Sequence, residues 1–114
     1  MTPAAPTSLR NITKLVSAEM IVAYSTNKLR KTCASSRLLK KEFNEAVGKA
    51  VERRLTQLRA VECMEDLTYL TGRWHPLSAD RAGEWAASLT PNWRIIVVPR
   101  GDDEAEVVRI EDYH

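Results

Sequence analysis

The period of the hydrophobic pattern changes once along the chain, at Gly72, and this change constrains the fold more than any other feature. Between residues 38 and 61, apolar side chains recur at the helical period, at Phe43, Val47, Val51, Leu55 and Leu58. After Gly72 the pattern alternates with a period of two, which is typical of strands that bury one face. Helices followed by strands predict an α+β fold.

Four short segments after Gly72 are rich in β-branched and aromatic residues: 73–77, 84–89, 93–98 and 106–114. The turns between them are short enough for antiparallel hairpins. An earlier apolar run, Ile21 to Tyr24, predicts a first strand. We therefore predict two N-terminal helices, a short one near 29–33 and a longer one over 38–61, packed on one face of a twisted antiparallel sheet of about four to five strands. Gly48 is the weak point of the longer helix, because Gly costs about 1 kcal/mol relative to Ala.

Length and composition indicate one small domain. The 114 residues leave room for one modest core. Residues 1–19 are polar and contain two prolines, so we predict a flexible extension there and a folded domain over 20–114. No apolar run approaches the ~18 residues of a membrane span, and the first residues do not resemble a secretory signal. Cys33 and Cys63 match neither a disulfide framework nor a metal-binding spacing, which favours free thiols in a cytoplasmic protein.

The charges of the chain are segregated. Residues 21–59 hold ten Lys and Arg against three acidic residues, whereas residues 101–114 hold six acidic residues against Arg109 alone. A basic face attracts phosphate backbones through a sequence-independent field. A solvated helix face is the alternative interpretation. The basic residues of the longer helical segment include Arg53.

The two histidines suggest chemistry on RNA. His75 lies in the first hairpin segment and His114 ends the chain. Cleavage of RNA through its own 2′-hydroxyl needs a base, an acid and a cation for the extra phosphoryl charge. Histidine suits the first two roles near neutral pH, and arginine, here Arg94, binds phosphate bidentately. Such chemistry needs no metal or other cofactor, and the sequence shows no zinc-ligand spacing. A structural role for each histidine is the alternative.

The last strand segment alternates toward its end, with Asp112 and His114 on one face and Tyr113 on the other. Regular pairing relaxes at a strand end, so we predict that all three side chains line one cleft. Asp112 pairing with a basic neighbour, and Tyr113 serving only in packing, are the alternatives. For the tryptophans a place in the core or the cleft wall is favoured over stacking on a base; they are Trp74, Trp85 and Trp93.

Four phrases of the second half, taken in order, resemble the HigB branch of the RelE/ParE toxin superfamily. They are W-H-P-L at 74–77, D-R-A-G-E-W at 80–85, N-W-R-I at 92–95 and V-R-I-E-D-Y-H at 108–114. The strand and helical segments of the first half look similar to the same family, so the resemblance covers about residues 20–114. Each phrase alone is weak, but four in register, ending in Asp-Tyr-His, are specific.

The resemblance implies a RelE-like fold and the toxin of a type II toxin–antitoxin pair. Such toxins cleave mRNA in the ribosomal A site, and a cognate antitoxin holds them inactive. The matching catalytic positions would be His75, Arg94, Asp112, Tyr113 and His114. The positions that would contact ribosomal RNA or mRNA are Lys28, Arg30, Lys31 and Arg81, to which the basic helix face adds Arg53. Which histidine is the base and which the acid stays open.

The chain departs from the family pattern in the turn before Arg81. The usual glycine of that turn is Ala79, and a usual basic residue is Ser78. If this position has a positive φ, Ala79 is strained there. The following strand is also unusually small in side chains, with Ala86, Ala87 and Ser88. Two rival hypotheses remain: a non-enzymatic poison of a protein target, as in the ParE branch, and a degenerate member that only binds an antitoxin.

Overall fold

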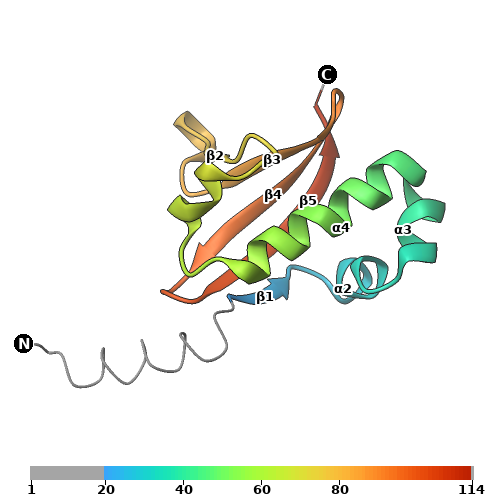
Figure 1. Cartoon of the computed structure of the whole chain (residues 1–114), viewed down its shortest axis with the longest axis horizontal. Coiled ribbons are helices and arrows are strands. Elements are labelled where there is room, and N and C mark those ends of the chain that lie inside the picture. The colour runs from blue at the N-terminus through green and yellow to red at the C-terminus, as the bar shows by residue number, and fades with distance from the viewer. Residues whose placement is uncertain (1–19, 114) are drawn as a thin grey trace, which may run out of the picture.

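The computed structural model describes residues 20–113, so the predicted extension over 1–19 and the side chain of His114 lie outside the described part (Figure 1). The elements include two 3₁₀ helices, η1 and η2. In chain order they are β1 (Ile21–Tyr24), α2 (Asn27–Cys33), α3 (Ser36–Glu42), α4 (Glu45–Ala60), η1 (Met64–Tyr69), β2 (His75–Pro76), η2 (Ala79–Arg81), β3 (Trp85–Thr90), β4 (Trp93–Arg100) and β5 (Glu104–Asp112). The α+β class is confirmed.

The expectation of one long helix over 38–61 is wrong, because α3 ends at Glu42 and a new helix, α4, begins at Glu45. Asn44 is the N-cap of α4, and its Oδ1 accepts a hydrogen bond of 2.8 Å from the Val47 backbone. Such a cap satisfies one of the free N–H groups at a helix start. Gly48 does not break α4. A Cβ at Gly48 would lie 3.3 Å from the Leu39 Cβ, so the glycine allows α3 to pack closely on α4.

The sheet has five strands in the order β1-β5-β4-β3-β2. The hairpin strands β2 to β5 are antiparallel, as predicted. The expectation of a wholly antiparallel sheet is wrong, because β1 pairs in parallel with β5. A parallel neighbour cannot be joined by a tight hairpin. The helices and the remaining strands lie between β1 and β5 in sequence, and they give the chain the length it needs to bring them side by side.

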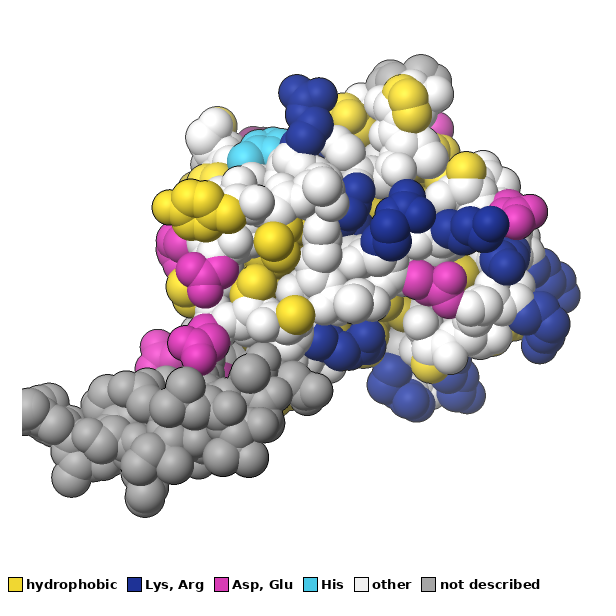
Figure 2. Space-filling model, in the orientation of Figure 1, with side chains coloured by type: hydrophobic (Ala, Val, Ile, Leu, Met, Phe, Trp, Pro, Cys, Tyr) yellow, Lys and Arg dark blue, Asp and Glu magenta, His cyan; other side chains and the backbone are white. Residues whose placement is uncertain are grey.

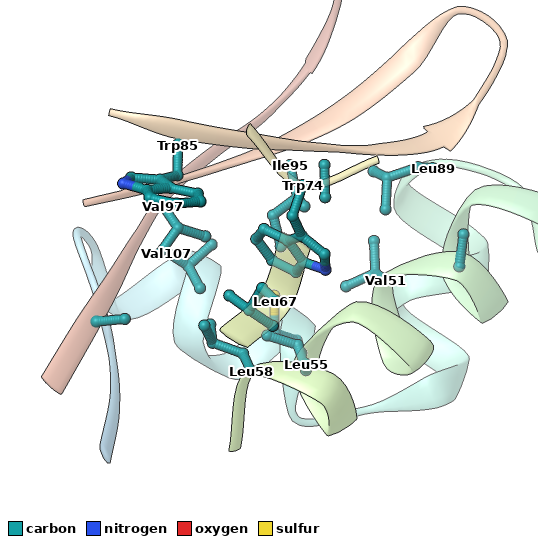
Figure 3. Packing of buried hydrophobic residues seen from close by; sticks show 14 of the residues in the cluster. Val51, Leu55, Leu58, Leu67, Trp74, Trp85, Leu89, Ile95, Val97 and Val107 are labelled. Carbon is teal, nitrogen blue, oxygen red and sulfur yellow. The ribbon is translucent and has the colours of Figure 1, made fainter. Parts of the chain in front are cut away.

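The core lies between the helices and one face of the sheet, which we call the inner face (Figure 1). Leu55 and Leu58 of α4 face Ile95, Val97 and Val107 of the central strands (Figure 3). Each fully buried aliphatic side chain stabilises the fold by roughly 1.5–3 kcal/mol.

The tryptophans are used mainly in packing, as the sequence favours. Trp74 and Trp85 are buried in the core (Figure 3). The Trp74 indole Nε1 donates a 2.9 Å hydrogen bond to Gln57 Oε1, which satisfies its polar end. Trp93 is half-buried and meets the ring of Phe43 edge to face, with centroids 5.4 Å apart.

One arginine of the basic segment lies in the core. The Arg54 Nε donates a 2.8 Å hydrogen bond to the Ser88 carbonyl of β3, and its Nη1 donates to Gln57. Burial lowers the pKa of Arg54. Gly72, with φ of +110°, makes room for this side chain, since a Cβ there would lie 2.5 Å from the Arg54 Nε. Arg54 therefore ties α4 to the sheet and adds nothing to the basic surface.

The cysteines are free thiols, as expected, with Cys33 buried and Cys63 half-buried. Burial raises the pKa of Cys33 to about 11, so this thiol is unreactive near neutral pH. Within residues 20–113, every helix is too short or too polar to cross a membrane.

Candidate functional site

The face of the sheet that the helices leave uncovered, here called the outer face, carries charged side chains. Ile95 and Val97 point into the core, so strand alternation turns Arg94 to the outer face. Arg94 lies opposite Glu111 in the register of β4 with β5, and directly opposed residues share a face. The charged residues that meet there, which we call the arginine–carboxylate cluster, are Arg81, Glu84, Arg94, Arg109 and Glu111.

Glu111 is the centre of this cluster and receives three arginines. The Arg94 Nε lies 2.7 Å from its Oε2, and the Arg109 Nε lies 2.9 Å from its Oε1. Arg81 donates to both oxygens, at 3.1 and 3.2 Å. Burial works against ionisation of this carboxyl, but the hydrogen bonds from the three arginines prevail and hold its pKa at about 2. Glu111 is therefore a permanent anion at physiological pH.

Glu84 links the ends of the cluster. Its Oε1 accepts from the Arg81 Nε at 3.0 Å and from the Arg109 Nη2 at 2.8 Å. Burial raises the pKa of Glu84, and the hydrogen bonds from Arg109 and Arg81 outweigh this and lower it. Three guanidinium groups thus face two carboxylates, which leaves the cluster with one positive charge in excess.

Arg94 and Arg81 differ in what remains available on each guanidinium. All three nitrogens of the Arg81 guanidinium donate to carboxylates of the cluster. Arg94 uses only its Nε, and its two terminal nitrogens donate to no residue within 20–113. Its guanidinium carbon lies 4.6 Å from the centroid of the Tyr113 ring, in a cation–π contact. Arg94 is therefore held from two sides, and its Nη1–Nη2 edge meets no partner in the described part of the chain.

The end of the chain lies beside Arg94. Asp112 is the last residue of β5 and pairs with Trp93, the residue before Arg94. The Tyr113 backbone N–H donates to the Asn92 carbonyl at 3.0 Å, which fixes the chain end against the β3–β4 turn (Figure 1). The Tyr113 side chain is 45% exposed, so its contact with Arg94 is at the surface. The structure thus brings together Arg94 and Tyr113, whereas Asp112 lies opposite Trp93 and shares its face, the inner one. His114 lies outside the described residues.

His75 lies on the same face but at the edge of the sheet. It pairs with Ala86, which pairs with Ile96, and Ile96 shares the outer face with Arg94. Two strand spacings, about 10 Å, separate β2 from β4. Ala86 and Ile96, which lie between His75 and Arg94 on this face, are fully buried. His75 Nδ1 lies 2.7 Å from the Arg73 carbonyl oxygen. In the neutral ring this contact favours the proton on Nδ1 and leaves Nε2 as the acceptor.

The turn that carries Arg81 is strained. Ala79 has a φ of +58°, in the left-handed region, so the departure from glycine at this position has the cost expected from the sequence. For a residue with a Cβ this conformation costs roughly 1–2 kcal/mol. The turn nevertheless ends with Arg81 bound to two carboxylates, which holds η2 over the outer face.

The remaining RNA-binding candidates lie on the helices. Lys28, Arg30 and Lys31 of α2 and Arg53 of α4 are exposed, and Figure 2 shows basic side chains gathered over the helical side of the molecule. Lys28 and Lys31 line a groove of about 460 Å³ between α2 and α3. Arg81 is apart from this set, on the outer face. The predicted RNA-binding residues therefore fall on two surfaces.

The sequence did not predict three members of the cluster as site residues: Glu84, Arg109 and Glu111. Counting from the β4–β5 turn does not find Glu111, because Arg94 lies six residues before Arg100 whereas Glu111 lies seven residues after Glu104, and the register shift at Ile96 and Val97 makes up the difference. Residues 20–113 contain no group of His, Cys, Asp and Glu that could hold a metal ion.

No protein-family model and no curated protein matches the sequence. Solved structures do match the fold. A YoeB/ParE toxin from Agrobacterium tumefaciens superposes with a TM-score of 0.57 at 12% identity, covering 83% of this chain and all of the other. YafQ from E. coli gives a TM-score of 0.55 at 18% identity, over 82% of this chain and 93% of the other. YoeB in a heterotetrameric YoeB–YefM toxin–antitoxin complex from Staphylococcus aureus gives 0.54 at 10%, over 83% and 97%.

These likenesses define the class of fold: the chain has the RelE/ParE-like toxin fold. They extend over nearly the whole length of each neighbour, so the similarity is that of a complete domain. At identities of 10–18% these neighbours show the fold alone.

Proposed function

We propose that this protein is the toxin of a type II toxin–antitoxin pair, of the HigB type, and that it cleaves mRNA in the ribosomal A site. The observation that carries the proposal is the environment of Arg94. Its guanidinium contacts the Tyr113 ring, keeps an Nη1–Nη2 edge that no residue within 20–113 occupies, and lies on the same face of the sheet as His75. A toxin fold and an open arginine next to candidate acid–base groups fit cleavage of RNA better than a passive surface does.

The chemistry assigned to this face is internal transesterification of RNA. A base removes the proton of the 2′-hydroxyl, and the 2′-oxygen attacks the adjacent phosphorus. The bond to the 5′-oxygen breaks, and an acid protonates that oxygen as it leaves. This leaves a 2′,3′-cyclic phosphate on one product and a 5′-hydroxyl on the other.

Arg94 stabilises the extra charge on the phosphoryl oxygens through the open edge of its guanidinium. His75 and His114 are the candidates for the base and the acid, and Asp112 and Tyr113 orient groups at the same place. No metal or other cofactor takes part in this scheme.

The basic helix face provides the docking surface. Lys28, Arg30 and Lys31, with Arg53 on the adjacent helix, present exposed cations to ribosomal RNA. Arg81 contributes through the positive excess of the cluster, since its own nitrogens are occupied by carboxylates.

A cognate antitoxin protein is the proposed inhibitory partner. The support is that the fold matches YoeB in a solved toxin–antitoxin complex. The cytoplasm is the proposed location, because the proposed substrate, mRNA on ribosomes, is found there.

The decisive experiment uses purified full-length protein with mRNA engaged on ribosomes. We expect cutting within the A-site codon, no cutting of the same free mRNA, and loss of cutting in His114→Ala with an unchanged melting temperature. Equal activity of the variant would contradict the role of His114.

Inhibition of gyrase supercoiling by wild type, without RNA cutting, would favour the ParE-like poison. No growth arrest on induction without antitoxin would favour the degenerate, antitoxin-binding member.

A further inference from the structure

We infer that Glu111 is a positioning residue, which orients Arg94 for the scissile phosphate through a single contact to Nε. The inference rests on the proposed function and deepens it. Glu111 itself does not touch the substrate in this scheme. It acts through Arg94, and Arg81 and Arg109 hold Glu111 in turn.

Glu111 determines which edge of the Arg94 guanidinium can bind a phosphate. A guanidinium can meet a phosphate with the edge formed by Nε and Nη2, or with the edge formed by Nη1 and Nη2. Glu111 Oε2 occupies the Arg94 Nε at 2.7 Å. A phosphate therefore meets the Nη1–Nη2 edge, which no residue within 20–113 occupies. Glu111 thus selects the direction from which Arg94 binds.

Glu111 also restricts the conformational freedom of the Arg94 side chain. A free arginine side chain has many rotamers and loses about 2 kcal/mol of conformational entropy when it is ordered. Here the Nε contact fixes one edge of Arg94, and the Tyr113 ring at 4.6 Å fixes one face. The side chain of Arg94 is 19% exposed, so little space remains for other orientations. The guanidinium is oriented before the substrate binds, and such preorganisation lowers the activation barrier.

The remaining effect of Glu111 is on the charge around Arg94. A lone carboxylate at 2.7 Å would neutralise Arg94 and weaken its attraction for a phosphate. Glu111 does not act alone, because Arg81 donates to both its oxygens and Arg109 to one. The positive excess of the cluster therefore extends to the Nη1–Nη2 edge of Arg94, which meets no partner among residues 20–113. Arg81 and Arg109 supply the compensating charge, which explains why three arginines meet one glutamate.

The test compares Glu111→Gln with Glu106→Gln, a matched control. Both glutamates are in β5, pair with an arginine, and are similarly buried, with side chains 19% and 20% exposed. Two quantities are measured with ribosome-bound mRNA: the single-turnover cleavage rate, and the affinity for an mRNA with a 2′-deoxynucleotide at the cut site. We expect Glu111→Gln to cut about 10- to 100-fold more slowly, as misplacement of a catalytic group does. Its affinity should stay within about threefold, because the net positive charge rises. Glu106→Gln should change neither quantity.

A double-mutant cycle separates positioning from general loosening of the sheet. If Glu111 acts through Arg94, then Glu111→Gln has no further effect on the cleavage rate in an Arg94→Ala background. A further slowing by the full factor would overturn the inference. Should Glu111→Gln not fold, Glu111→Asp keeps the charge but withdraws the oxygen from the Arg94 Nε, and the same slow cleavage at unchanged affinity is expected.

The outcomes distinguish the two levels of the proposal. If wild type cuts no mRNA on ribosomes, the proposed function is wrong and the positioning role falls with it. If wild type cuts and Glu111→Gln cuts as fast as Glu106→Gln, only the positioning role is wrong.

Discussion

The two faces of the sheet use arginine in opposite ways. On the inner face, Arg54 is buried among apolar side chains, donates to a backbone carbonyl and an amide, and fills the space that Gly72 leaves. On the outer face, Arg94 is held by a carboxylate and an aromatic ring, and two of its nitrogens meet no partner among residues 20–113. The inner arginine is enclosed by the fold, with only 8% of its surface exposed. The outer one is oriented by the fold but not satisfied by it.

This difference teaches how to recognise a candidate site among many arginines. Exposure alone does not identify the candidate site, since Arg30 and Arg53 are more exposed than Arg94. The hydrogen-bond donors that remain unoccupied are more informative: Arg81 lies in the same cluster as Arg94, but its guanidinium nitrogens are all occupied. A side chain that is ordered by several neighbours and still has free donors is prepared for a ligand. On this account the inner face controls only stability, and the outer face controls mainly activity.

The largest expected effect is on the inner face. Leu58 is fully buried, and Leu58→Ala should lower the free energy of unfolding by about 4 kcal/mol, through lost burial and a cavity. Urea unfolding measures this. Leu70→Ala, at a side chain 41% exposed, is the control and should cost far less. Cleavage per folded molecule should not change in either variant. A loss near 1 kcal/mol for Leu58→Ala would mean that the core is not packed as described.

The corresponding change on the outer face is Arg94→Ala. Loss of one preorganised donor group to a transition-state oxyanion costs about 3 kcal/mol, or a factor of about 100 in rate. Single-turnover cleavage on ribosomes should fall by this factor, while the midpoint of urea unfolding shifts little. Arg100→Ala, which removes an exposed arginine paired with Glu106, is the control and should retain full activity. Parallel losses of stability and activity in Arg94→Ala would erase the contrast between the two faces.

Lowering the pH is expected to have a smaller effect on the free energy of unfolding. The pKa of Glu111 is about 2 in the folded protein, below its ordinary value of 4.5, so its contribution to stability is present above pH 4.5. It is lost as the pH falls from 4.5 toward 2. The advantage of wild type over Glu111→Gln in unfolding free energy should be about 2 kcal/mol at pH 7 and should shrink through this window. A difference between the two proteins that is independent of pH would contradict the ion pairing described.

The smallest effect is expected at the strained turn. Ala79→Gly relieves a positive φ but makes the unfolded chain more flexible, so the net gain in stability should be within about 1 kcal/mol. Thermal unfolding measures it, with Ala82→Gly as a control at a residue of ordinary φ (−56°) in the same turn. The control should lose stability. A loss in Ala79→Gly as large as in Ala82→Gly would show that the turn at Ala79 is not strained.

Local signals allowed much of the fold to be predicted from sequence. The first strand is found where the apolar run predicts it, and the four later strands lie within the expected segments or a few residues beyond them. The break before α4 was missed because the apolar period continues across it, and only the capping ability of Asn44 marks it. The parallel pairing of β1 was missed because it joins the two ends of the described chain, and no local pattern encodes a neighbour so distant.

The candidate site could be predicted only in part. Arg94, Asp112 and Tyr113 follow from the resemblance; the structure places Arg94 and Tyr113 together and puts Asp112 on the inner face, opposite Trp93. The cluster around Glu111 could not be predicted, because it depends on the register of β4 with β5. A shift in that register at Ile96 and Val97 moves the partner positions by one residue. A one-residue error there would turn Glu111 to the inner face.

The central claim, cleavage of RNA by its own 2′-hydroxyl at the outer face, is tested most directly on ribosomes that carry two mRNAs. One has ribose throughout and the other has a single 2′-deoxynucleotide at the cut site in the A-site codon. The account predicts that wild type cuts the first, leaving a 2′,3′-cyclic phosphate, and does not cut the second at that position. Cutting of the deoxy-substituted mRNA at the same bond, or no cutting of either, would contradict it.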